Sequence, residues 1–588
     1  MTKVDWLIVL ALNGSIVAYG FYLARGVRSS ADWFLAGRSL PFWIVGLSMY
    51  ATAIDASDIV ADSGFTYNVG FSFFIANMVG VVGGWGLAAF FVFLPLYRAG
   101  MYTNAEYLEA RFGPSARVLC AFIQVQYRTL VLAVMGGSLY WTVQIVCGWS
   151  PTESMSVVVG VAIFASFYTA MGGLKSVAIT DVLQFGVMTA AAIVVWCLIY
   201  DKVGGWTGVE EKLAAHDPDL TDLCHVGRDV TSATDVSEKA PREISRLLEL
   251  GGEYRAEEGA IVRTTPGWLV VLGFLIIGCA YPIVNHTQSM RMFAAKSVWD
   301  FKMTAGVAGL CLIVMTYFNL TMGVFGRALY PDAGQLTADG TTTDKIYPFL
   351  VSQLEMPGVT GLIVAGIFAA ALSTYDSIGS SISSLLTRDV YARLVVKDRD
   401  DAHYLRVGQW LTPVIIGLSF LYMPFLLGGT MVDYFLDVTS AFVVPLLTLF
   451  LLGRFTRVHR ASGTIGLLVG SAYGLLRLSA PRIAESFGIA VLPPIMVNSF
   501  AAYPISMLIT TATMVLVSLV KGWQPRGAPL KSVAAEGAWL RSSQEALRQL
   551  GVGTTETEAS SGIRGALPVI LALAVLALGS YLCFVVLW

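Results

Sequence analysis

Long apolar stretches recur along almost the whole chain, and they restrict the folds that it can adopt. A helix needs about 20 consecutive apolar residues to cross a hydrocarbon core about 30 Å thick. The runs of Leu, Val, Ile, Phe and Ala in these apolar stretches lack the alternation of polar and apolar residues that marks the strands of an outer-membrane barrel. The pattern predicts an all-α polytopic membrane protein with fourteen spans, at approximately residues 5–25, 41–68, 72–97, 115–147, 153–170, 178–200, 266–290, 303–328, 357–386, 405–427, 433–453, 460–478, 497–520 and 566–588.

The composition agrees with a membrane protein and excludes several other classes. Only 13% of the 588 residues are charged, against roughly 25% in an average soluble domain. The net charge of −2 offers no basic surface for a nucleic acid. The chain has no HExxH, GxSxG or P-loop motif and no CxxC pair, so we expect neither an enzyme nor a zinc site or disulfide framework.

The first segment and the loop charges set the expected orientation. The first segment lacks a convincing basic start or cleavage site, so we expect it to remain as a helix. If the N-terminus lies outside, the inner loops carry Arg25, Arg28 and Arg38 and the basic clusters at 388–399 and 454–460. Lys and Arg are enriched in cytoplasmic loops. We therefore expect a multi-pass protein of the cell membrane with both termini outside.

Two long polar insertions interrupt the apolar pattern. Residues 201–265 form a predicted outer loop, rich in acids, that could fold as a small cap. Residues 521–564 form a predicted inner linker containing EGAWLRSSQEALRQL, which has the pattern of an amphipathic surface helix. Neither insertion carries clustered metal ligands or a nucleophile motif, so we interpret both as structural.

Three acids in the second segment are the first candidates for function. This segment, LSMYATAIDASDIVADSGFTYNVG, places Asp55, Asp58 and Asp62 among small residues after a run that makes a poor continuous helix. Ionisable residues within a membrane are costly and usually functional. A broken helix here would expose carbonyls that line a cavity or hold an ion. The alternative is a solvated position near the outer interface, which we favour for Asp62 but not for the other two acids.

The ninth segment carries a stripe of hydroxyl groups. In GLIVAGIFAAALSTYDSIGSSISSLLTRDVY, Ser373, Thr374, Ser377 and further serines recur at helical spacing. Ser and Thr often serve only as small packing residues between membrane helices, but this stripe is longer than packing requires. Hydroxyls and carbonyls can hold sodium without burying a net charge, and Asp376 could add charge for a second cation or a proton.

The loop after the fifth segment, GGLKSVAITDVLQ, can be read in two ways. Gly172 and Gly173 permit a tight turn, and Thr180 and Asp181 would then open the sixth helix as an N-cap with an acid in its first turn. From the residues alone, we favour this capping interpretation.

The same loop resembles the GG-x-x-A/S-V-x-x-T-D-x-x-Q signature of the sodium:solute symporter family. The AAALST stretch of the ninth segment resembles the sodium-binding helix of that family, and the second segment resembles its broken first core helix. Fourteen helices with both termini outside also match the galactose transporters of the family.

The resemblance implies a LeuT-type core of five-plus-five inverted repeats, with sites near the midplane where discontinuous helices meet. It divides the chain into a first helix and inner loop (1–40), a first repeat of helices 2–6 (41–200), an extracytoplasmic loop (201–265), a second repeat of helices 7–11 (266–453), helices 12–13 (454–520), a cytoplasmic linker (521–564) and helix 14 (565–588).

The resemblance also implies the ligands of sodium. The conserved sodium site of the family corresponds here to backbone carbonyls of Ala51, Ile54 and Ala370 and to the hydroxyls of Ser373 and Thr374. A second cation site, present in some members, corresponds to Asp181, Ser373, Asp376 and Ser377. Because Asp376 replaces a serine of that pattern, the second site stays open.

The solute pocket departs from that of the sugar transporters. Tyr281, in CAYPIVNHTQSMR, matches the gating tyrosine of the family, but the sugar-contacting positions carry Ser57, Asp58, Asn77, Gly80, Gly278 and Leu436. A polyol needs many paired donors and acceptors, so these replacements argue against a sugar. Arg128, on the fourth segment, either binds a solute carboxylate or pairs with an acid such as Asp58, and we favour pairing. A zwitterionic or carboxylated solute fits both charges.

These observations predict a sodium-coupled symporter that imports a small polar organic solute by alternating access. Its expected partners are sodium, the solute and the lipid bilayer, and we expect it to act as a monomer. The alternatives are a proton-coupled transporter of the same fold, a membrane sensor domain, a passive channel and a membrane enzyme. The inner linker is too short for a kinase core, which argues against the sensor.

Overall fold

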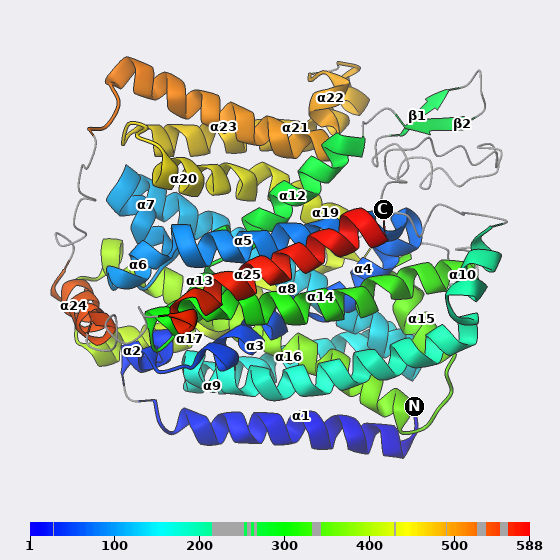
Figure 1. Ribbon diagram of the computed structural model, residues 1–588. Helices are drawn as coiled ribbons and strands as arrows, with labels where there is room; N and C mark the ends of the chain where they lie inside the picture. The colour runs from blue at the N-terminus through cyan, green and yellow to red at the C-terminus, as the bar shows by residue number, and fades with distance from the viewer. Residues whose placement is uncertain are drawn as a thin grey trace.

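The structure is a computed structural model that describes residues 1–27, 29–214, 252–255, 260–263, 267–331, 343–427, 431–489, 491–525, 537–552 and 562–587. Its long helices lie side by side in one bundle (Figure 1). The strands of the described residues are β1 (Gly252–Arg255) and β2 (Ala260–Arg263), an antiparallel pair within the predicted outer loop. The predicted all-helical membrane architecture is therefore confirmed, with one short hairpin added.

Ten apolar helical stretches of the described residues are each long enough to cross a membrane. The elements that form them are α1 (Lys3–Ala24), α8 (Pro114–Cys147), α9 (Pro151–Val203), α14 (Val298–Leu329), α16 (Val359–Leu385) with η10 (Leu386–Val395), α17 (Asp401–Ser419) with α18 (Met423–Leu426), α19 (Met431–Val438) with η11 (Thr439–Val443) and α20 (Val444–Phe455), α21 (Ser462–Phe487), α23 (Ser499–Lys521), and α25 (Ile563–Tyr581) with η13 (Leu582–Val586).

Two further spans are each broken in the middle. α3 (Phe42–Ala53) and α4 (Ala56–Val69) meet at a bend of 50°, and so do α12 (Gly267–Val284) and α13 (His286–Phe293). The breaks occur in the first helix of each predicted repeat. This position is the one expected where two inverted repeats meet at a central site.

The remaining predicted segments are accounted for by a turn and a short helix. α9 has 53 residues, which as one straight helix would measure about 80 Å, far more than a bilayer needs. Gly173 interrupts it with a φ of +57° and a ψ of −167°, a conformation that favours glycine. A shorter apolar helix covers Ala76–Val92. All fourteen predicted segments thus coincide with apolar helices, and the number that cross the membrane stays a prediction.

Shorter elements connect the spans. They are α2 (Ser30–Leu35), η1 (Ala36–Arg38), η2 (Gly70–Phe73), η3 (Ala76–Val81), α5 (Val82–Leu87), η4 (Ala88–Val92), α6 (Leu94–Arg98), α7 (Asn104–Phe112), α10 (Gly205–Leu213), η9 (Thr343–Lys345), α15 (Ile346–Ser352), α22 (Pro494–Val497) and α24 (Ala538–Val552).

α16 forms the centre of the bundle, where almost every residue from Thr360 to Leu385 is buried. It packs against α9, α1, α17 and α8. α25, by contrast, lies on the outside of the bundle against α14 (Figure 1). Hydroxyl groups on α16 therefore face protein rather than lipid, which is where polar groups in a membrane helix are tolerated.

α24 is the helix predicted within the inner linker. Its apolar face, with Trp539, Leu540 and Leu547, is buried, and the helix packs against α6 and α17. The Trp539 indole N–H donates to Asp401 at 2.8 Å and its ring stacks on Tyr404 at 4.0 Å. The helix is thus held at one end of the bundle by specific contacts.

Candidate sodium site and solute cavity

The break between α3 and α4 follows from local capping chemistry. Ile54 leaves the helix in an extended conformation, and Asp55 starts a new helix as its N-cap. The Asp55 carboxylate accepts hydrogen bonds from the backbone N–H (2.7 Å) and the hydroxyl of Ser57, and Asp58 accepts from the Asp55 N–H at 2.6 Å. This reciprocal pair is a capping box. Two of the acids in the second segment therefore produce the predicted break.

α16 lies directly against this break. The Ser373 hydroxyl donates to the carbonyl of Ala51 at 2.9 Å and to that of Ala370 at the same distance. The neighbouring Thr374 hydroxyl is buried and has no hydrogen-bond partner among the described residues. Ile54 is also buried, at the end of α3. The five predicted sodium residues thus lie at one junction, whose carbonyl and hydroxyl oxygens are ligands that suit a hard cation.

The predicted second cation site contains an arginine. Asp181 accepts from Ser48 at 2.5 Å and from Arg291 Nη2 at 3.0 Å, and Arg291 also donates to the Ser377 hydroxyl. Arg291 Nε donates to Ser48 at 2.8 Å. We call Ser48, Asp181, Arg291 and Ser377 the paired cluster. A guanidinium thus supplies the positive charge beside Asp181 and Ser377.

Asp376 points away from the paired cluster. Its Oδ1 accepts from the Thr169 hydroxyl at 2.7 Å, and its Oδ2 is buried without a hydrogen-bond partner among the described residues. The structure therefore does not bring all the predicted residues of a second cation site together.

The capping interpretation of Asp181 is wrong. Thr180 and Asp181 lie inside the second part of α9, where Thr180 donates to the carbonyls of Ser176 and Val177. The helix resumes soon after Gly173, so both residues are well past its first turn. The acid faces α3 and α13 instead of capping a helix end.

Arg291 was missed in the sequence, although a signal for it was present. It follows Tyr281 by ten positions in the same quoted stretch, at the end of an apolar segment. Any charged residue at membrane depth is a functional candidate, and here the side chain is fully buried.

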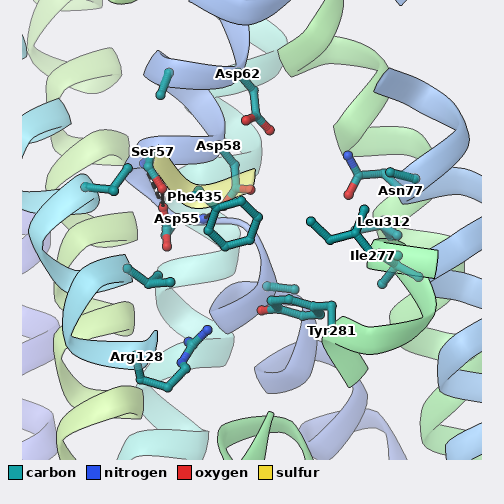
Figure 2. Close-up of a pocket in the computed structure, with 17 residues that line it drawn as sticks. Asp55, Ser57, Asp58, Asp62, Asn77, Arg128, Ile277, Tyr281, Leu312 and Phe435 are labelled. Atoms are coloured by element: carbon teal, nitrogen blue, oxygen red, sulfur yellow. Dashed lines mark hydrogen bonds between the residues drawn. The ribbon is translucent and has the colours of Figure 1, made fainter. Parts of the chain in front are cut away.

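All five predicted solute residues line one cavity beside the helix break, which we call the solute cavity (Figure 2). α4 contributes Ser57 and Asp58, η3 contributes Asn77, α8 contributes Arg128 and α12 contributes Tyr281. The other residues of its wall are Ala53, Asp55, Ala61, Asp62, Ala76, Val81, Val131, Val134, Ile277, Gly278, Leu312 and Phe435.

Asp62 differs from its expected position. Its side chain lines the solute cavity and is only 9% exposed, whereas a place at the outer interface would leave it solvated. Asp55, Asp58 and Asp62 follow each other at helical spacing, so α4 presents them on one face. In Figure 2, Asp62 lies at one end of the cavity and Arg128 at the other.

Tyr281 connects the solute cavity to the end of α3. Its hydroxyl donates to the Thr52 carbonyl at 3.4 Å and accepts from Gln288 at 3.3 Å. Arg128 makes no ion pair with a carboxylate in the described part of the chain, so the favoured pairing with Asp58 does not occur there. The Nε atom of Arg128 is buried and has no hydrogen-bond partner among the same residues.

Two departures from the sugar transporters have a packing reason. A Cβ on Gly278 would lie 2.3 Å from the Ala76 carbonyl oxygen, and one on Gly80 would lie 2.9 Å from Gly278 Cα. α12 and η3 therefore approach too closely for a polar side chain at either position. Leu436 is buried, and its carbonyl accepts from Tyr503 at 2.8 Å.

Comparison with curated proteins finds relatives at low identity over most of the chain. Sodium/glucose cotransporter 4 of Danio rerio is 25% identical, with 93% of this chain and 85% of that protein covered. Sodium/glucose cotransporter 2 of Rattus norvegicus is 28% identical over 81% of this chain and 71% of its own. A sodium/mannose cotransporter of Bos taurus is 27% identical, with 95% and 92% covered.

A solved structure and a family match complete the comparison. The substrate-bound outward-open state of a Na+-coupled sialic acid symporter aligns with a TM-score of 0.70 and 20% identity, covering 90% of this chain and 99% of that one. This alignment confirms the LeuT-type fold. The sequence model of the sodium:solute symporter family matches residues 33–470 of this chain. Because this match covers well over half of its length, the chain belongs to the sodium:solute symporter family.

Proposed function

We propose that the chain couples the entry of sodium to the import of a small polar solute, with sodium held between the α3–α4 break and α16. One observation supports this site above all: Ser373 is bonded to the Ala51 carbonyl, beside a buried Thr374 hydroxyl with no partner among the described residues. In water-free surroundings such a hydroxyl is costly unless a ligand satisfies it. The carbonyls of Ile54 and Ala370 complete the proposed ligand set.

The proposed cycle depends on the movement of α16 relative to the break. Sodium favours an outward-open state that binds the solute. The solute closes the outer side, and on inward opening Ser373 and Thr374 separate from Ala51 and Ile54 and release the ion. Each charge that moves down 100 mV supplies about 2.3 kcal/mol, and the two ligands couple through their preference for shared states.

We further propose that the chain acts as a monomer, with both termini outside the cytoplasm and 41–200 and 266–453 as the two repeats.

Proton coupling is the second candidate function. The buried Asp376 Oδ2, which has no hydrogen-bond partner in the described residues, favours it, because a proton there would neutralise a buried carboxylate. In the symporter, Asp181, Asp376 and Ser377 would form the second cation site only if Arg291 moved aside and Asp376 turned away from Thr169 toward Asp181.

Uptake into proteoliposomes tests the sodium site. We expect the double variant Ser373→Ala with Thr374→Ala to lose sodium-stimulated uptake while remaining folded, as judged by size-exclusion chromatography. Ser380→Ala is the matched control, since that hydroxyl donates only within its own helix. Unchanged sodium dependence in the double variant would remove the assigned site, and uptake driven by a pH gradient without sodium would favour the proton.

A further inference from the structure

Resting on the proposed symport, we propose that the transported solute is a zwitterion whose ammonium group lies against Asp58 and Asp62 and whose carboxylate faces Arg128. The solute would thus carry a positive charge at the end of the cavity near Asp62 and a negative charge at the end near Arg128.

The acids of α4 are not equally available to a solute. The Asp55 carboxylate is engaged by Ser57, as a helix cap. Asp58 accepts a hydrogen bond from the Asp55 N–H, and its carboxyl group also bonds to the Asp55 side chain. Asp62 accepts no hydrogen bond from the described residues, although it is nine-tenths buried. Asp62, beyond the cap, is therefore the acid most available to a solute, with Asp58 beside it on the same helix face.

Arg128 provides the independent observation at the opposite end. It is 1% exposed, it lines the same cavity, and its Nε has no hydrogen-bond partner within the described ranges. Its guanidinium lies 5.4 Å from the centre of the Tyr127 ring and also bonds to the Tyr127 side chain, so Nε is the part of the fork left for another partner. An arginine fork fits a carboxylate in bidentate geometry.

The walls between these charged ends are largely apolar. Ile277, Leu312 and Phe435 face the cavity from three different helices (Figure 2). A neutral polyol would leave the charges unpaired and would meet few hydrogen-bonding groups on these walls. A simple carboxylate would satisfy Arg128 but approach the acids, and a simple amine would do the reverse. A zwitterion satisfies both ends at once.

A metal ion is a poorer occupant of the acids. No group of three or more His, Cys, Asp or Glu side chains converges on a point in the described residues. Asp58 and Asp62 are spread along one helix face, about 6 Å apart along its axis, so they suit an organic ammonium group better than a metal ion, which needs ligands that converge on one point.

Thermal unfolding of the full-length chain in detergent, in sodium or in potassium chloride, tests the inference. The probes are a matched series: 2-aminobutyrate, 4-aminobutyrate and glycine betaine carry both charges, butyrate and butylamine carry one, and galactose carries none. We expect at least one zwitterion to raise the melting temperature in sodium with saturable concentration dependence. The single-charge probes and galactose should need at least tenfold higher concentrations for the same shift.

Variants then locate the two ends. Asp62→Asn and Arg128→Gln should each weaken zwitterion binding at least tenfold, whereas Asp32→Asn, which changes an acid of α2 outside the cavity, should leave it unchanged. Asp58→Asn is a second variant for the ammonium end. Galactose or butyrate binding as well as the zwitterions, or unchanged zwitterion affinity in the cavity variants, would overturn the inference.

The two proposals can fail separately. If sodium alone stabilises the chain but no zwitterion does, the solute class is wrong and the sodium site stands. If a zwitterion stabilises the chain equally in sodium and in potassium, the solute class stands and the sodium coupling is wrong.

Discussion

Two sets of buried charges lie close together in the core of this protein, and they are arranged in opposite ways. In the paired cluster, Arg291 bonds directly to Asp181, with hydroxyl groups of Ser48 and Ser377 around them. In the solute cavity, Arg128 lies apart from Asp58 and Asp62, and largely apolar walls enclose the space between them. The difference indicates that the first set holds helices together and the second set is complete only with a ligand.

The largest expected effect is on the paired cluster. Arg291→Gln leaves Asp181 as a buried charge without its partner, and breaking a buried ion pair in this way destabilises proteins by about 3–5 kcal/mol. We expect a large fall in melting temperature or loss of folded protein. Adding Asp181→Asn should recover part of the stability, because the uncompensated charge is then removed. Full stability of the single variant would contradict the structural role of the pair.

Removing a charge from the solute cavity should have the opposite effect: stability should be kept and solute binding lost. Asp62→Asn removes an unpaired charge, so we expect the melting temperature without solute to stay the same or rise. Solute binding should weaken at least tenfold, which corresponds to about 1.4 kcal/mol. Thermal unfolding with and without a bound zwitterion measures both quantities. A destabilised variant with normal binding would place Asp62 in the structural set.

A third variant tests an uncharged group, the buried Thr374 hydroxyl of the proposed sodium site. Thr374→Val keeps the shape of the side chain and removes only the buried hydroxyl. Since this hydroxyl has no partner in the described residues, the loss should change stability in potassium by less than about 1 kcal/mol. The extra stability that sodium confers should disappear. Thr374→Ser, which keeps the hydroxyl, is the matched control and should retain the sodium effect.

The smallest effect is expected at Asp55, which lines the cavity but works as a helix cap. Asparagine caps helices about as well as aspartate, so Asp55→Asn should alter the melting temperature little and solute affinity by less than about threefold. Asp55→Ala should destabilise by about 1 kcal/mol because the cap is lost. A tenfold loss of binding in the asparagine variant would instead group Asp55 with Asp58 and Asp62.

Much of this arrangement could be predicted from the sequence. The apolar segments, the break at Ile54 and the hydroxyls of Ser373 and Thr374 depend on local composition and on short motifs, which a single chain displays. Five residues of the solute cavity can be predicted from their family positions, whereas the sequence favours the outer interface for Asp62. The sequence shows which of these residues are charged, but it does not show which charged side chains lie in contact.

The parts that escaped prediction depend on contacts between distant segments. The local pattern around Asp181 predicts a cap, and its partner Arg291 lies 110 positions away, where no local pattern can indicate it. Arg128 and Asp58 were expected to pair, since opposite charges in a membrane usually do. In the structure, the packing of α8 and α4 keeps the Arg128 and Asp58 side chains apart. The sequence of either segment alone does not predict that spacing.

α24 bears on the energetics of inward opening. It contacts segments from both halves of the chain: Arg38 donates to its Leu547 carbonyl at 3.2 Å, and its Ala538 N–H donates to Asp398 at 2.7 Å. Any rearrangement that separates those segments on this side must stretch or release the helix. Its contacts therefore belong to the free-energy difference between conformations, so loosening α24 would shift that balance without touching either the ion or its cargo.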